Sequence, residues 1–174
     1  MPNHVSNVLT IRGKESRIDD LREFAKGPNP EFKESRFDAG LRVRRNREGG
    51  KPDDFKPEPV IDELQCHKFV PVPQDVLDSG YGEKDSRGYN WCCDNWGTKW
   101  GCYDIETSYV SGDGDYAFLT YSFHSAWAPP LLVIDAMAAK YPCLKFRLEW
   151  FDPCDAKCHV ILWRKGARIE KAHA

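Results

Sequence analysis

The chain has 174 residues, of which 41% are hydrophobic and 30% charged, a balance typical of one globular domain rather than of a disordered segment. Its formal net charge is −2, which excludes the overall positive charge of many nucleic-acid-binding proteins but leaves room for a local basic patch. No stretch approaches the roughly 20 apolar residues that span a bilayer, and the N-terminus lacks a secretory pattern. We therefore expect a cytoplasmic protein with no membrane partner.

The first predicted elements are a strand and a helix. Residues 5–11 place Val5, Asn7, Leu9 and Ile11 on one side of a strand. An apolar stripe then predicts a helix over residues 16–26, beginning at a capping-box pattern and ending at a Gly-Pro pair.

A polar insertion is predicted at about 28–100. Its first part is rich in proline and carries a basic block followed by an acidic one, with a short strand expected around residues 41–43. A second strand-like pattern covers residues 64–72, and residues 74–77 suggest a helical turn.

Regular elements return in the second half of the chain. Strands are predicted near residues 103–110 and 116–124, joined by a glycine-rich turn, followed by a helix near 130–141 and a strand near 144–151. Together with the first strand and helix, this gives the order βαββαβ. The sequence therefore predicts an α+β, ferredoxin-like fold: a split-βαβ antiparallel sheet with both helices on one face. Residues 160–164 add an extra C-terminal strand, and we interpret residues 1–174 as a single domain.

Four segments carry a resemblance to a known family. They are MPNHVSN at residues 1–7, KFVPVP at 68–73, NWGTKW at 95–100 and AWAPP at 126–130. These segments resemble the YubB-type family, which is similar to the Api proteins of bacteriophages and plasmids. The resemblance implies a ferredoxin-like domain and an origin in a bacterial mobile element. It implies no catalytic residue, and the fold name implies no iron–sulfur cluster.

The segment NWGTKW is the densest candidate site. Trp96, Lys99 and Trp100 could form a recognition surface, with an indole stacking on a base or filling a partner's pocket. The alternative is structural: the indoles attach the insertion to the sheet. Because Gly97 and Gly101 disfavour a regular element, we expect a tight loop that buries one indole and leaves the other partly exposed.

Other candidate groups give weaker signals. Arg42, Arg44 and Arg45 could neutralise phosphates, although the acidic block that follows favours a solvated loop. The seven cysteines lack the spacing of a zinc site, so we expect no metal and no cofactor. His124 beside Ser125, with Asp104 on the neighbouring strand, could form a nucleophile–base pair only if the fold brings them together.

These patterns favour a non-enzymatic binding protein of a phage or plasmid. Its expected partner is a bacterial host protein or complex, and inhibition of host defence is one specific form of this hypothesis. The alternative is a nucleic-acid-binding module that uses the sheet face and its aromatic residues. The segment at residues 116–121 supplies aromatic side chains, but the sequence around it supplies no basic partner. The sequence leaves the oligomeric state undetermined.

Overall fold

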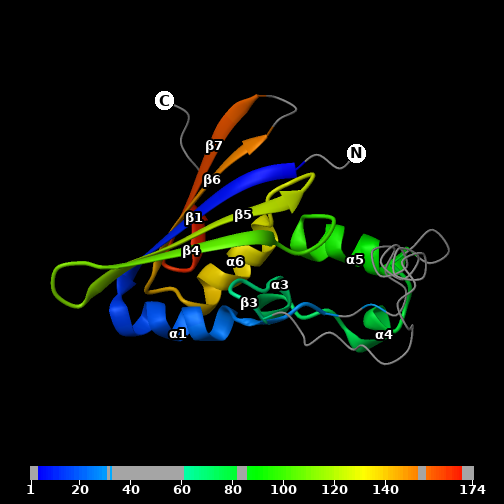
Figure 1. The fold of residues 1–174 in the computed structure, drawn as a ribbon, viewed down its shortest axis with the longest axis horizontal. Coiled ribbons are helices and arrows are strands. Elements are labelled where there is room, and N and C mark those ends of the chain that lie inside the picture. The colour runs from blue at the N-terminus through cyan, green and yellow to red at the C-terminus, as the bar shows by residue number, and fades with distance from the viewer. Residues whose placement is uncertain (1–3, 31, 33–60, 82–85, 153–155, 170–174) are drawn as a thin grey trace, which may run out of the picture.

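The computed structural model describes residues 4–30, 32, 61–81, 86–152 and 156–169, and the fold is shown in Figure 1. Six strands form one antiparallel sheet in the order β4-β5-β1-β6-β7-β8. These strands are β1 (His4–Lys14), β4 (Tyr103–Ser111), β5 (Tyr116–Ala126), β6 (Lys145–Asp152), β7 (Lys157–Arg164) and β8 (Ala167–Ile169). A separate two-stranded ribbon pairs β2 (Gly27–Pro28) with β3 (Ile61–Asp62).

The fold is ferredoxin-like, as the sequence predicts. Helix α1 (Glu15–Ala25) follows β1, and helix α6 (Leu131–Lys140) follows β5. Both helices lie on the same face of the sheet (Figure 1), and the Tyr141 hydroxyl just after α6 donates to the carbonyl oxygen of Asp20 in α1. The core between the sheet and the helices includes Leu9, Ile18 and Met137, all fully buried.

Buried and exposed side chains alternate along the strands, which gives the sheet two different faces. In β1 the odd-numbered residues from Val5 to Ile11 are buried, as predicted, while most of the even-numbered residues are exposed. The same alternation runs through β5, where Leu119 and Tyr121 are buried. Because successive side chains point to opposite faces, one face carries the core and the other carries the polar half of each strand.

Helix α5 (Arg87–Trp96) is not predicted from the sequence, and it ends at Trp96, whereas residues 97–102 form the expected loop before β4. Cys92 and Trp96 lie one turn apart on its buried side. Gly97 has a left-handed φ of 78° and ends this helix. The glycine is therefore a helix terminator, a common role for a residue with no Cβ penalty, and not evidence against a helix.

The insertion is also less polar than predicted. Residues 64–72 form the short helix α3 (Cys66–Phe69) instead of a strand, and α4 (Gln74–Leu77) follows as the expected helical turn. Leu64, Cys66 and Val72 are buried in the core. The predicted strand at residues 41–43 lies outside the described residues.

Two element ends differ from prediction. Helix α1 begins at Glu15, and its N-cap Lys14 makes no side-chain cap, so the predicted capping box is absent. After β7, Lys165 and Gly166 both have positive φ values, 53° and 79°. Two such residues in succession form the tight turn of a β-hairpin, which adds the unpredicted strand β8. Among the described residues, no helix is long and apolar enough to cross a bilayer.

Candidate functional site

The two tryptophans of the central motif have different environments, as expected. Trp96 is buried with only 2% of its surface exposed. Its indole N–H donates to the carbonyl oxygen of Val70 at 2.9 Å, which joins two parts of the insertion, and its ring is part of the hydrophobic core. Trp100 is only half-buried and lies beside Lys99. The structural alternative therefore describes Trp96, and a role in binding stays a prediction for Lys99 and Trp100.

Three aromatic rings surround the ammonium group of Lys99. Its Nζ lies 4.7 Å from the ring centre of Trp127, 5.1 Å from that of Trp100 and 5.5 Å from that of Tyr89. Each distance is within the range of a cation–π interaction. The sequence gives no sign of this arrangement, because Trp127 is 27 residues from Trp100 along the chain.

Trp127 sits on a strained turn that a buried polar network holds in place. Its φ of 73° is unusual for a bulky residue, and its side chain is 49% exposed. Before the turn, the hydroxyl of Thr98 donates to the carbonyl oxygen of Ala126 at 2.8 Å. The Ser125 hydroxyl donates across the turn to the carbonyl oxygen of Ala128 and accepts from the Asn7 amide. The turn thus presents an exposed indole in a fixed position.

Ser125 and His124 do not form a nucleophile–base pair. Ser125 is fully buried on the helix-covered side, whereas His124 belongs to the opposite face of β5. His124 Nδ1 lies 3.7 Å from the Asp104 carboxylate, so the structure does bring together the histidine and the aspartate of the predicted group. Ser6 and Ser122 lie on the same face as His124, but no hydrogen bond joins His124 to either hydroxyl among the described residues.

The remaining predicted groups contribute little to a site. Arg42, Arg44 and Arg45 lie outside the described residues. Cys66 and Cys102 are buried with their Sγ atoms 3.6 Å apart, and the hydrogen bond between the thiols raises the pKa of Cys102. No group of three or more potential metal ligands occurs among the described residues. The absence of a metal stays a prediction.

The second face of the sheet is left uncovered by the described helices (Figure 1). We call it the open face. It carries most of the exposed large hydrophobic side chains of the described residues: Val8, Val110, Tyr116, Phe118, Phe151 and Ile169. Contiguous exposed apolar groups with polar neighbours are typical of an interaction surface.

A hollow of about 360 Å³ lies on the open face across the sheet's central strands. Four basic side chains line it, and we call it the basic hollow: Arg12, Lys145, Arg147 and Arg164, with Thr10, Phe118 and Leu162 between them. Phe118 is 42% exposed beside these cations. The sequence around residues 116–121 supplies no basic partner, and in the structure that partner comes from β1, β6 and β7.

Three of the four cations lack a compensating carboxylate. Arg147 forms a two-pronged ion pair with Glu149, with Nη2 2.7 Å from Oε1. The side chains of Arg12, Lys145 and Arg164 have no ion-pair or hydrogen-bonded partner among the described residues. Arg12 and Lys145 are direct cross-strand neighbours, a like-charge pairing that destabilises a sheet. An anionic ligand would relieve this repulsion.

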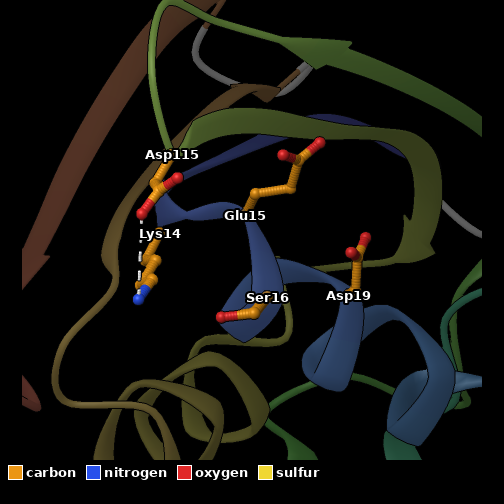
Figure 2. Close-up of a pocket in the computed structure, with 5 residues that line it drawn as sticks. All are labelled: Lys14, Glu15, Ser16, Asp19 and Asp115. Carbon is orange, nitrogen blue, oxygen red and sulfur yellow. Dashed lines mark ion pairs between the residues drawn. The ribbon is translucent and has the colours of Figure 1, made fainter.

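A second hollow, of about 370 Å³, lies at the β1–α1 junction and has the opposite character (Figure 2). Two of its three acidic side chains are already engaged: Asp115 pairs with Lys14, and Glu15 accepts hydrogen bonds from the hydroxyls of Tyr109 and Ser111, while Asp19 also lines the hollow. The hollow is therefore a less suitable ligand site than the basic hollow.

The other end of the open face carries a pair of stacked rings. Tyr103 and His124 are cross-strand neighbours with ring centres 5.9 Å apart and planes inclined by 28°. The Tyr103 hydroxyl is hydrogen-bonded to His4, and partial burial is the main cause that raises the pKa of Tyr103. The phenol is therefore neutral at ordinary pH. Trp100 lies next to it, with ring centres 6.4 Å apart.

Comparisons with known proteins agree with this architecture. Residues 98–172 match the family model described as a ferredoxin-like domain in Api92-like protein. The chain is also similar to the crystal structure of a protein api92 from Yersinia pseudotuberculosis, with a TM-score of 0.61, 9% sequence identity and coverage of 98% of this chain and 97% of that chain. At this identity, the likeness concerns the fold. No curated protein matches the chain.

The family match confirms the Api-like part of the resemblance, while a phage or plasmid origin stays a prediction. The matched range begins just before β4 and omits β1 and α1. Strand β1 nevertheless lies between β5 and β6 in the sheet and contributes Arg12 to the basic hollow.

Proposed function

We propose that the protein is a non-enzymatic binding protein that holds single-stranded nucleic acid on the open face of its sheet. The observation that carries this proposal is the cross-strand row of Phe118, Arg12 and Lys145. In this row, the exposed ring of Phe118 lies beside Arg12, which in turn lies beside Lys145, and neither cation has an acidic partner among the described residues.

The chemistry of the row fits the two parts of a nucleotide. Phosphates are neutralised by Arg and Lys, and a planar base stacks on an exposed aromatic ring. Bases in a duplex are already stacked on one another, so their faces are available to a protein ring only in a single strand. An acidic protein partner would satisfy the cations but would not require the ring.

The net charge of −2 does not oppose this proposal, because the relevant charge is local. Among the described residues, no carboxylate lines the basic hollow with its four cations, and the nearby Glu149 is held by Arg147. Local positive potential attracts a polyanion even on a protein whose overall charge is slightly negative.

The proposal predicts salt-sensitive binding that depends on Phe118. Fluorescence anisotropy with labelled single-stranded RNA and DNA should show affinity falling as salt rises. Phe118→Ala should weaken binding on the order of tenfold, since stacking of one base on an aromatic ring contributes about 1–3 kcal/mol. Leu132→Ala is the matched control, because Leu132 on α6 is exposed to the same extent as Phe118, 41% against 42%. Affinity that is independent of salt, or equal losses in both variants, would refute the proposal.

A protein partner is the second candidate, in line with the sequence-based prediction of a phage- or plasmid-borne protein that acts on a bacterial host protein or complex. The strained turn at Trp127 favours it, because backbone strain maintained by a buried network is typical of functional positions. Trp127→Gly removes the indole and is compatible with a positive φ. Pull-down from a bacterial lysate followed by mass spectrometry should lose a partner with this variant but retain it with Leu132→Ala. A partner that both variants retain would argue against this surface.

A further inference from the structure

The open face has aromatic groups at both ends of β5, and only one end belongs to the basic hollow. Phe118 lies at that end, and the stacked rings of Tyr103 and His124 lie at the other. Phe118 and His124 are on the same face of the same strand, six residues apart. At about 3.3 Å per residue, their backbones are separated by roughly 20 Å.

The surface between these ends is lined by small polar side chains. Thr120 and Ser122 follow Phe118 on the open face of β5, and Thr10 lies opposite Thr120 on β1. Hydroxyl groups of this kind can donate to phosphate oxygens and accept from sugar hydroxyls. On the other flank, Glu106 of β4 lies opposite Ser122. Its carboxylate disfavours a phosphate on that side and directs a polyanion toward β1.

Positive charge is present again beyond the far end. Trp100 adjoins Tyr103, and the ammonium group of Lys99 lies 5.1 Å from the centre of the Trp100 ring. No carboxylate pairs with Lys99 among the described residues. The far end therefore resembles the basic hollow in placing an accessible aromatic group next to a cation, but it also carries the Asp104 carboxylate, 3.7 Å from His124 Nδ1.

We propose that Tyr103 and His124 form a second base-stacking subsite, so that one single strand lies along β5 from Phe118 to His124. This inference rests on the proposed nucleic-acid function and adds a minimum ligand length to it. A stacked strand advances about 3.4 Å per nucleotide, so about six nucleotides cover the roughly 20 Å between the subsites. A more extended strand needs fewer nucleotides.

A length series tests the second subsite. Oligouridylates and oligothymidylates from about two to about ten nucleotides are titrated against the wild type and a Tyr103→Ala/His124→Ala variant. Wild-type affinity should rise steeply, on the order of tenfold, as the length passes about four to six nucleotides, and then level off. The variant should bind the shortest oligomers as the wild type does and should lack this rise. The RNA and DNA series show which nucleic acid is the ligand.

His159→Ala is the matched control, because His159 is stacked on Trp150, with ring centres 4.9 Å apart, away from the open face. It should keep the wild-type length dependence. His124→Gln alone, which disturbs the strand less than the double variant, should reduce the rise without abolishing it. A rise in the double variant as large as in the wild type would overturn the second subsite. Failure of every oligomer to bind the wild type would instead overturn the proposed function itself.

Discussion

Replacing both Arg12 and Lys145 with glutamate is expected to weaken binding of single-stranded nucleic acid on the order of 100-fold at moderate salt. Each cation contacts a phosphate in the proposed complex, and loss of one charge-assisted contact of about 1.5 kcal/mol lowers affinity roughly tenfold. The slope of log affinity against log salt should also become shallower, by about 0.7 for each phosphate contact that is lost. Anisotropy titrations at several salt concentrations measure both quantities.

The control variant reverses the charge of two basic side chains on the helix-covered side of the sheet. Arg17 and Lys26 of the α1 region form exposed ion pairs with Asp20 and Glu23, so Arg17→Glu/Lys26→Glu makes the same change in net charge away from the open face. It should weaken binding only slightly. Comparable losses in both double variants would show that net charge, and not the basic hollow, governs binding.

The single change Arg12→Glu separates binding from stability. It converts the like-charge pair with Lys145 into a cross-strand ion pair. Chemical denaturation should therefore show a gain of about 0.2–1 kcal/mol in the free energy of unfolding, while affinity for the nucleic acid falls. When the loss of a charged group stabilises the fold but weakens binding, that group is typical of a surface maintained for a ligand. A loss of stability would show that Arg12 serves the fold.

Trp96→Ala is expected to cause the largest loss of stability, about 3–5 kcal/mol. The indole is buried, packs edge-on against Trp91 with ring centres 5.6 Å apart, and donates its N–H to Val70. Truncation leaves both a cavity and an unsatisfied carbonyl oxygen of Val70 between α5 and the segment that follows α3. Thermal unfolding should shift downward on the order of 10 °C for a chain of this size.

Trp100→Ala provides the comparison on the neighbouring tryptophan. Because Trp100 is half-buried and its contacts are to Lys99 and Tyr103, its removal should cost about 1 kcal/mol or less. Equal, large losses in both variants would mean that the whole motif is structural. The proposed role of Lys99 and Trp100 in ligand binding at the far end of the open face would then be wrong.

The strands predicted near residues 5–11, 103–110, 116–124, 144–151 and 160–164 and the two main helices agree with the structure to within a few residues, because each follows from a local period. The strand predicted at 64–72 is wrong, since this segment contains helix α3. Alternation from Val5 to Ile11 requires a strand with one buried face, and the turn with glycines at 112 and 114 joins β4 to β5. Helix α5 is not predicted from the sequence, because Gly97 is interpreted there as a helix breaker. In the structure, Gly97 is the C-terminal cap of this helix.

The candidate site was only partly predictable for a different reason. Trp96, Lys99 and Trp100 are conspicuous as a sequence cluster, yet the structure separates a buried indole from an accessible lysine and indole. Arg12, Lys145 and Phe118 are unremarkable in sequence, each being a polar-side position of a predicted strand. The βαββαβ order already implied that β1 lies between β5 and β6, so the topology was a usable signal for their proximity.

By itself, the sequence determined the strands and helices of the βαββαβ core and which face of each core strand is buried, because these properties depend on periods of two and 3.6 residues along a continuous segment. Tertiary structure alone decided which polar-side residues become neighbours. Arg12 lies beside Phe118 and Lys145 only because the registers of β1 against β5 and of β1 against β6 place them there. A shift of one residue in either pairing would move a side chain to the opposite face, so the composition of the basic hollow depends on strand register, which the turns and the packed core fix together.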